Sequence, residues 1–371
     1  MLIGICGALC AGKNTIANYL AEHHGFQRIY LVESASEGGD PALNSTTHPP
    51  STKGSSSTLC PITFTSSDDL LNFVTKHWRT RYVTTHIDSP SLLDQLSRRP
   101  FFLLISVDAP ILRRYSRHVA RCRGQRNPES GEELMNFEAF AQQSDEHLYS
   151  PSTGLFSLSA RADIVLLNTS TSVAHLYATL GRLSLQDEGR LRPSWDMYFM
   201  SLASLAAKRS NCMKRRVGCV LVRDKRVVAT GYNGTPRGLT NCMEGGCGRC
   251  NGTNASGEQE AGGQGSGVGL ATCLCLHAEE NALLEAGRGR ISGGLGIDGG
   301  GEEGSILYCD TCPCLTCSIK IAQVGIKEVV YAHGYSMDEQ TARVLGEAGV
   351  KLRQFVPPAN GLIHLENLDL N

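Results

Sequence analysis

The cysteines of this chain are concentrated in one segment, and this distribution constrains the fold more than any other feature of the sequence. Eleven of the 15 cysteines lie between Cys212 and Cys317. Such a cluster is either the disulfide framework of a secreted protein or a set of metal ligands in a reducing compartment. Residues 1–11 are apolar but lack the basic start and the cleavage site of a signal peptide. We therefore expect zinc ligands in a protein of the cytoplasm, with the nucleus as a further location.

Length and charge limit the number of domains and the class of ligand. The chain has 371 residues, and single hydrophobic cores rarely grow beyond about 250–300 residues, so we expect two domains. Lysine and arginine total 35 against 36 for aspartate and glutamate, so no basic field indicates a nucleic acid or a membrane surface as partner. No apolar run approaches the roughly 18 residues that cross a bilayer.

The first part of the chain predicts a parallel α/β domain over residues 1–190. Residues 34–60, rich in Ser, Thr, Pro and Gly, are expected to form a disordered loop. A charged connector that ends at Pro193 marks the domain boundary. Three apolar runs are typical of buried strands, the last of which is expected to end the sheet: residues 2–6, 101–107 and 163–168.

The loop after the first strand resembles a phosphate-binding P-loop, G-x-x-x-x-G-K-[ST]. Such a loop holds phosphate with backbone N–H groups and offers its lysine to the terminal phosphate oxygens. Asn14 replaces the hydroxyl that holds Mg²⁺, although Thr15 can substitute for it, so Mg²⁺ is expected only together with a bound nucleotide. The predicted residues of this site are Gly7, Gly12, Lys13, Asn14 and Thr15.

A later strand followed by arginines resembles the lid region of nucleotide kinases and dephospho-coenzyme A kinases. Asp108 and Pro110 follow the strand, and Arg113, Arg114 and Arg117 come next. An active kinase, a nucleotide-binding regulatory module and a decayed scaffold are all compatible with this pattern. We favour a kinase-like fold without phosphate transfer, because the second domain by itself accounts for a complete enzyme.

The second domain, residues 191–371, carries ligands typical of catalytic zinc. His277 and Glu279 form one motif, and Cys314 and Cys317 lie in a second, Pro-Cys-x-x-Cys. One imidazole and two thiolates suit zinc and leave its fourth tetrahedral position open to water, unlike a structural site. Both cysteines stand at the start of a predicted helix, whose dipole favours thiolates. Glu279 can therefore move the proton of the water that zinc activates without itself binding zinc.

These motifs together resemble the zinc-dependent deoxycytidylate (dCMP) deaminases, in particular the longer forms that carry an N-terminal extension. The pattern H-x-E…P-C-x-x-C is itself the signature of nucleobase deaminases. The resemblance implies a cytidine-deaminase-like three-layer α/β/α domain with a mixed sheet, preceded by the P-loop kinase-like parallel domain. It is carried by residues 210–218, 231–236, 277–282, 313–317 and 325–331.

The resemblance also implies the reaction and its control. It implies hydrolysis of dCMP to dUMP and ammonia, which feeds thymidylate synthesis, with dCTP as activator and dTTP as inhibitor. The effectors imply a second nucleotide site near residues 231–234, and the family is typically a homo-oligomer, a hexamer. His277, Cys314 and Cys317 correspond to the zinc ligands, and Glu279 corresponds to the proton shuttle.

Substrate contacts follow from the same resemblance. Asn233 corresponds to the residue that hydrogen-bonds the deoxyribose. The phosphate contacts are expected among Lys214, Arg215, Arg216 and Tyr335, and which of the three cations contacts the phosphate stays open.

The remaining cysteines predict a second, structural zinc. Cys212 and Cys242 correspond to positions where some family members hold such an ion, and further ligands should come from the loop before the catalytic histidine. We favour the set Cys212, Cys242, Cys250 and Cys275, with Cys247 and Cys273 as substitutes. Ordinary buried thiols are the alternative.

Two other functions are compatible with the motifs. A deaminase of cytosine or adenine in nucleic acid is disfavoured by the neutral charge and by the lack of a basic, aromatic strip. A non-catalytic zinc-containing nucleotide-binding module would have no need for Glu279 or Pro313.

Overall fold

The computed structural model divides the chain into two units. The second unit runs from Pro193 to Pro358, and the first comprises the residues before it together with the C-terminal strand. No helix among the described residues is long and apolar enough to cross a membrane. The expected loop at 34–60 and Tyr335 lie outside the described part of the chain. The structure describes residues 1–32, 62–125, 134–151, 154–252, 272–291, 304–334, 338–356 and 362–365.

The first unit is a parallel sheet with helices on both faces. Its strands are β1 (Leu2–Gly7), β2 (Gln27–Leu31), β3 (Ile62–Phe64), β4 (Tyr82–Thr84), β5 (Phe102–Asp108), β6 (Ile164–Leu167) and β12 (Leu362–His364). Its helices are α1 (Lys13–His24), α2 (Ser67–Lys76), α3 (Pro90–Ser97), α4 (Ile111–Gln125), α5 (Phe137–Tyr149), α6 (Phe156–Ser159) and α7 (Val173–Leu183), followed by the 3₁₀ turn η2 (Glu188–Arg190). The strand order is β12-β6-β5-β1-β4-β2-β3, and every described pair is parallel.

Alternate residues of the central strand β1 enter two different cores. Ile3 and Ile5 pack with residues of α1 and α7. Leu2 and Cys6 pack with residues of α2, α3 and α6 on the other face. This alternation follows from the period of two in a strand, and both faces are apolar because helices cover both. The predicted parallel α/β architecture of the first domain is therefore confirmed.

The C-terminal strand corrects two predictions. β12 pairs in parallel with β6, with Leu362 opposite Val165, so the strand expected to end the sheet is not its last. The second domain also does not extend to residue 371, because the chain returns to the first unit. Leu365, just after β12, is fully buried in the core beside β1 and β5. A strand of three residues is too short to be predicted from its own sequence, because its stability comes from pairing with a distant strand.

The second unit is a mixed sheet between helices, and the predicted hairpin at its start is confirmed. Its strands are β7 (Gly218–Arg223), β8 (Arg226–Tyr232), β9 (Ile306–Thr311), β10 (Glu328–His333) and β11 (Lys351–Gln354), in the order β11-β10-β9-β7-β8. Its helices are α8 (Trp195–Ala207), α9 (Gly248–Asn251), α10 (Ala278–Ala286), α11 (Arg288–Ile291), α12 (Leu315–Val324) and α13 (Asp338–Glu347), with the 3₁₀ turn η3 (Cys242–Glu244). β7 pairs antiparallel with β8 and β9, whereas β9, β10 and β11 are parallel.

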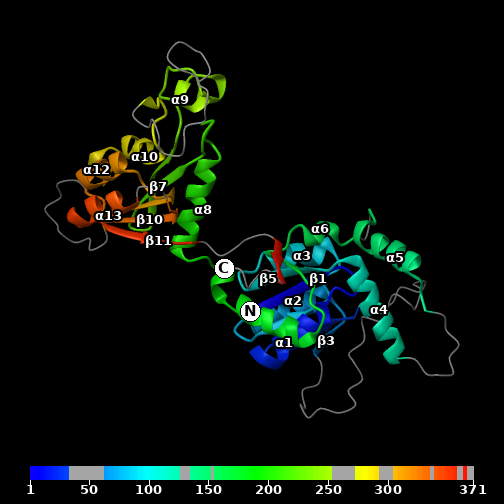
Figure 1. The fold of residues 1–371 in the computed structure, drawn as a ribbon. Helices are drawn as coiled ribbons and strands as arrows, with labels where there is room; N and C mark the ends of the chain where they lie inside the picture. The colour runs from blue at the N-terminus through cyan, green and yellow to red at the C-terminus, as the bar shows by residue number, and fades with distance from the viewer. Residues whose placement is uncertain are drawn as a thin grey trace. The chain divides into compact units, whose positions relative to one another are not determined.

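Strand β7 shows the three layers of the second unit. Val220 and Val222 pack against residues of α8 on one face. Cys219 and Leu221 pack with residues of α10 and α12 on the other face. Figure 1 shows α8 on one side of the sheet and α10, α12 and α13 on the other. The predicted three-layer α/β/α arrangement with a mixed sheet is confirmed.

Gly231 of β8 sets the distance between the sheet and α10. A Cβ atom at this position would lie 2.1 Å from the carbonyl oxygen of Ala278 and 2.5 Å from the backbone nitrogen of Ala282. Only glycine permits this approach, because a real Cβ atom needs more than 3 Å from backbone atoms. The first turn of α10 therefore lies directly on the end of β8.

Gly231→Ala should destabilise the second unit by about 1–3 kcal/mol, because α10 must move away from β8 to make room for the methyl group. The chain has two tryptophans, so a Trp78→Phe background leaves Trp195 of α8 as the fluorescent reporter of this unit. Urea unfolding of that reporter measures the change. Gly346→Ala in α13 is the matched control, since a Cβ there meets nothing within 4 Å. Equal midpoints for both variants would contradict the close contact.

Candidate active site

The N-termini of two helices meet at one end of the sheet and bring three predicted ligands together. His277 is the N-cap residue of α10, and Cys314 is the N-cap residue of α12. The Nδ1 atom of His277 lies 3.3 Å from the Sγ atom of Cys314 and 3.3 Å from that of Cys317. The three donor atoms all lie within 4.8 Å of one another.

This donor set fits a zinc ion. With Zn–N near 2.0–2.1 Å and Zn–S near 2.3 Å, tetrahedral geometry places the nitrogen and sulfur ligands about 3.5 Å apart, close to the distances around His277. Hydrogen bonds from Cys317 and His277 lower the pKa of Cys314 to about 3, so its sulfur is a thiolate at neutral pH. Three protein ligands leave one tetrahedral position for water or substrate.

Glu279 lies beside these ligands without joining them. It is the second residue of α10 and is 4% exposed. Burial raises its pKa to about 7, against a smaller opposing effect of His277. A bound cation acts in the same direction as His277 and favours the carboxylate. A carboxyl group that titrates near neutral pH can both accept and release a proton during a reaction.

Glu280 joins the two helices that carry the ligands. One carboxylate oxygen accepts a hydrogen bond from the backbone N–H of His277 at 2.9 Å. The other oxygen forms an ion pair with Lys320 of α12. The sequence reasoning missed this role, although a glutamate three residues after a helix N-cap is a known capping signal.

Buried hydroxyl groups support the turn that holds Cys314. The Ser318 hydroxyl donates to the carbonyl oxygen of Cys314 at 2.9 Å, and the Thr341 hydroxyl of α13 donates to that of Pro313 at 2.7 Å. Both side chains are completely buried. The Cys314 carbonyl oxygen also accepts the backbone N–H of Ser318, so the hydroxyl adds a second hydrogen bond there, and together these bonds hold the turn in one conformation.

Asn233, the residue expected to bind deoxyribose, connects two loops beside the ligands. Its Nδ2 donates to the carbonyl oxygen of Arg215, and its Oδ1 accepts from the N–H of Val217, both at 2.8 Å. The next residue, Gly234, pairs with Leu276, directly before His277 in the chain. A primary amide keeps a second N–H after these two bonds. The predicted phosphate contacts Lys214, Arg215 and Arg216 are exposed on the same loop.

Asp310, at the end of β9, is a site residue that the sequence reasoning missed. Its Oδ2 accepts a hydrogen bond from the N–H of Gly218 at 3.1 Å. Its Oδ1 is buried and has no hydrogen-bond partner among the described residues. Burial raises the pKa of Asp310, and Arg215 opposes this effect. A buried carboxylate oxygen without a partner is available to water or a substrate.

The other cysteines divide into two groups. The four cysteines predicted to hold a second zinc, Cys212, Cys242, Cys250 and Cys275, converge with their sulfur atoms within 4.8 Å of one another. Cys309 and Cys312 belong to no metal-ligand group of the described residues. The Sγ atom of Cys309 instead lies 3.3 Å from that of Cys219 on the neighbouring strand. No disulfide bond joins the cysteines that the structure describes.

The predicted phosphate loop of the first unit connects β1 to α1. Gly7 has a φ of +128°, and a Cβ there would lie 2.0 Å from the carbonyl oxygen of Val107 in β5. Lys13, the first residue of α1, donates from Nζ to the carbonyl oxygens of Gly7 at 2.8 Å and Ala8 at 3.0 Å. Burial lowers the pKa of Lys13 to about 8.

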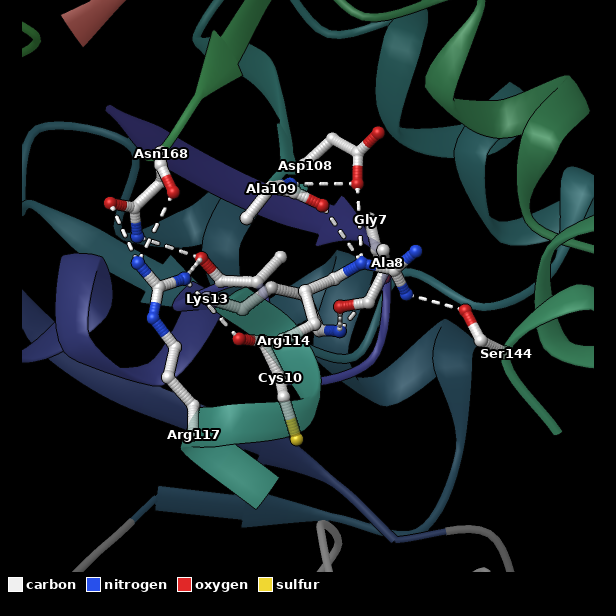
Figure 2. A network of polar contacts seen from close by, with 11 residues as sticks. Gly7, Ala8, Cys10, Lys13, Asp108, Ala109, Arg114, Arg117, Ser144 and Asn168 are labelled. Carbon is white, nitrogen blue, oxygen red and sulfur yellow. Dashed lines mark hydrogen bonds and ion pairs between the residues drawn. The ribbon is translucent and has the colours of Figure 1, made fainter. Parts of the chain in front are cut away.

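Arginines of α4 surround this loop, as Figure 2 shows. Arg117 donates to the carbonyl oxygens of Cys10, Ala11 and Asn168. Arg114 is buried and donates to the carbonyl oxygen of Ala109 and to the hydroxyl of a serine in α5. Among the described residues, the three cations Arg114, Arg117 and Lys13 have one carboxylate within ion-pair distance. It belongs to the exposed Asp108, which lies 3.8 Å from Arg114.

Asn14, at the position expected to hold a magnesium hydroxyl, is engaged elsewhere. Its Oδ1 accepts a hydrogen bond from Nη2 of Arg28 at 2.8 Å and another from the Thr85 hydroxyl at 3.3 Å. The Nη1 of the same guanidinium donates to Asn18 at 2.7 Å. A positive charge therefore lies beside the oxygen that would face a metal ion.

Known proteins resemble this chain over almost its whole length. Residues 193–333 match the family described as the cytidine and deoxycytidylate deaminase zinc-binding region. A deoxycytidylate deaminase of Schizosaccharomyces pombe is 45% identical over 360 residues, which cover 97% of this chain and 99% of that protein. A deoxycytidylate deaminase of Saccharomyces cerevisiae is 39% identical over 364 residues, 96% of each chain. A crystal structure of a dCMP deaminase from the cyanophage S-TIM5 with dCMP and dUMP is 30% identical, covers 44% of this chain and 98% of that one, and has a TM-score of 0.31.

These matches show that the chain belongs to the cytidine and deoxycytidylate deaminase family. The predicted resemblance to the deoxycytidylate deaminases is thereby confirmed, and the protein is a hydrolytic deaminase.

Substitutions of the adjacent Glu279 and Glu280 should separate proton transfer from positioning. Glu279→Gln keeps the size of the side chain but cannot take up a proton, so kcat should fall by about 10²–10⁴-fold while the zinc content stays unchanged. Glu280→Ala removes the acceptor of the His277 N–H and the ion pair to α12, so zinc affinity should fall by about 10- to 100-fold. Ammonia release and zinc retention against a chelator measure the two effects.

Glu285→Gln provides the control, because Glu285 is exposed on the same helix. It should change neither readout. Undiminished turnover in Glu279→Gln would remove that residue from the proton path, and unchanged zinc affinity in Glu280→Ala would remove it from the support of the site.

Proposed function

We propose that this protein hydrolyses dCMP to dUMP and ammonia, and so supplies dUMP for thymidylate synthesis. The observation that carries the proposal is the meeting of His277, Cys314 and Cys317 beside the buried carboxyl group of Glu279. The two relatives that match nearly the whole chain are both named deoxycytidylate deaminase.

The chain's own residues account for the proton transfers of this reaction. When bound, zinc lowers the pKa of water from about 15.7 to about 7 and so supplies a nucleophile at neutral pH. Glu279 takes a proton from the attacking water and delivers it to the ring nitrogen N3. Glu279 then carries the second proton of the water to the exocyclic amino group. The bond between C4 and this amino nitrogen breaks in the same step. The water oxygen remains as the C4 carbonyl of dUMP, and ammonia leaves.

The loop that Asn233 braces is the proposed substrate-binding loop. The second N–H of its amide would donate to the deoxyribose, and the exposed Lys214, Arg215 and Arg216 would bind the monophosphate. Activation by dCTP, inhibition by dTTP, a second nucleotide site near residues 231–234 and a hexameric assembly remain proposals that rest on the family.

We propose a second function for the first unit, in which the P-loop-like segment from Gly7 to Lys13 binds nucleotide phosphate without transferring it. The support is the surplus of positive charge: Lys13 and Arg117 donate to carbonyl oxygens of the loop, which phosphate oxygens can replace. Arg28 beside the Asn14 amide oxygen disfavours Mg²⁺ at the usual position. Phosphate transfer normally depends on that ion, so a regulatory role fits better.

Ammonia release should be fastest from dCMP among four substrates: dCMP, deoxycytidine, cytidine and a cytosine-containing oligonucleotide. Removing the phosphate should raise KM because the cations at residues 214–216 lose their partner. Each substrate is measured with and without dCTP and dTTP. A preference for the oligonucleotide would overturn the proposed substrate, and equal KM values for dCMP and deoxycytidine would remove the phosphate contacts.

Lys13→Ala should weaken binding of tripolyphosphate to the full-length protein by at least about tenfold, which corresponds to one lost charge-assisted hydrogen bond. Calorimetric titration measures this, with the exposed Lys76→Ala as the matched control. The wild-type protein should transfer no phosphate from ATP to nucleoside monophosphates. Measurable transfer that disappears in Lys13→Ala would instead establish a kinase.

A further inference from the structure

Six cysteines of the second unit form a cluster separate from the candidate active site. Four of them are buried, and two are half-buried. They form a local core of their own in which every member is a cysteine. The six-cysteine cluster consists of Cys212, Cys242, Cys247, Cys250, Cys273 and Cys275.

The six-cysteine cluster contains two overlapping sets of four possible metal ligands. The first set is Cys212, Cys242, Cys250 and Cys275, and the second is Cys247, Cys250, Cys273 and Cys275. The sulfur atoms within each set lie within 4.8 Å of one another. Cys250 and Cys275 belong to both sets, so the other four cysteines divide equally between them.

The sulfur separations match the edges of a zinc-thiolate tetrahedron. Four sulfurs at about 2.3 Å from a central zinc lie about 3.8 Å from one another. The Sγ atom of Cys250 is 3.7 Å from that of Cys212 and 3.6 Å from that of Cys273. The pair Cys247 and Cys273 is separated by 3.9 Å. A disulfide would instead require about 2.05 Å, and all six are free thiols.

We propose that the six-cysteine cluster binds two zinc ions that share two thiolates. Cys250 and Cys275 bridge the ions, and each ion completes its tetrahedron with two further cysteines. Two four-coordinate ions need eight metal–sulfur bonds, and two bridging plus four terminal sulfurs supply that number. The single ion predicted from sequence would use only the first set and leave Cys247 and Cys273 without a role.

The surroundings of the six-cysteine cluster suit a negatively charged metal centre. Six thiolates around two Zn²⁺ ions leave two negative charges. The Arg249 guanidinium lies close enough to the sulfurs of Cys273 and Cys250 to interact with both. The backbone N–H of Met213 also donates to the cluster, to the sulfur of Cys242 at 3.5 Å. Donors of this kind stabilise metal-bound thiolates and orient them.

The position of the six-cysteine cluster assigns it a structural role for the active site. Cys275 lies two residues before His277, and Cys212 lies two residues before Lys214. Between them, the short helix α9 holds Cys250. No aliphatic side chain belongs to this local core as the structure describes it, so metal–sulfur bonds would supply the stabilisation that apolar packing supplies elsewhere.

Metal analysis of the full-length protein tests the number of ions. We expect three zinc ions per chain, one of them at the candidate active site. His277→Ala, which weakens the active-site ion, should still retain two, so this count is independent of the proposed deaminase function. A wild-type count of two with one ion left in His277→Ala would overturn the pair in favour of a single structural zinc.

Serine substitutions test the assignment of ligands. The double variant Cys247→Ser/Cys273→Ser removes both terminal ligands of the second set and should lose one ion, whereas the predicted single site would lose none. Cys122→Ser in the first unit is the control and should retain all ions.

The wild-type protein allows a test that does not depend on the folding of variants. After exchange of zinc for ¹¹³Cd, NMR should show two resonances from cadmium ions with four thiolate ligands each, in addition to the active-site signal. X-ray absorption of the zinc protein should show a metal–metal distance of about 3 Å, as expected for tetrahedra that share an edge. A single four-thiolate resonance and no metal–metal scattering would overturn the proposal.

Discussion

The active site depends on the contact between the first turn of α10 and the end of β8. Gly231 permits this contact because it has no Cβ atom, and the N-cap residue His277 thereby reaches the N-terminus of α12. Two helix N-termini at one point concentrate positive potential, which favours the thiolate of Cys314 and the carboxylates nearby. Glu280 strengthens the arrangement, because it accepts a hydrogen bond from one helix and pairs with Lys320 of the other.

Two kinds of core stabilise the second unit, one of aliphatic side chains and one of cysteines. The sheet and its helices bury aliphatic side chains on both faces. The loops that approach the active site have a core of cysteines instead. These loops carry Asn233, the exposed cations and the segment before His277, so their order matters for substrate binding. Metal ions can hold such loops rigid where there is too little apolar surface to bury.

The first unit carries a different chemistry on a parallel sheet. Its loop after β1 faces Lys13 and Arg117, whose contacts with the loop are carbonyl oxygens. Phosphate oxygens are stronger partners for these groups than carbonyl oxygens are. The engagement of Asn14 by Arg28 separates phosphate binding from the metal chemistry that transfer requires. A nucleotide-sensing role beside a deaminase is consistent with both observations.

Residue types and their spacing predict the candidate zinc ligands and the helices that carry them. His277, Glu279, Cys314 and Cys317 could be identified because ligand type and spacing are local properties, and α10 and α12 follow from helical periodicity. Features that depend on distant segments of the chain become visible only in the folded protein. The pairing of β12 with β6, the unsatisfied oxygen of Asp310 and the sharing of Cys250 and Cys275 by two ligand sets all arise from contacts between remote segments. The spacing of residues along the chain does not predict the distances between remote segments, because loop length constrains those distances only weakly.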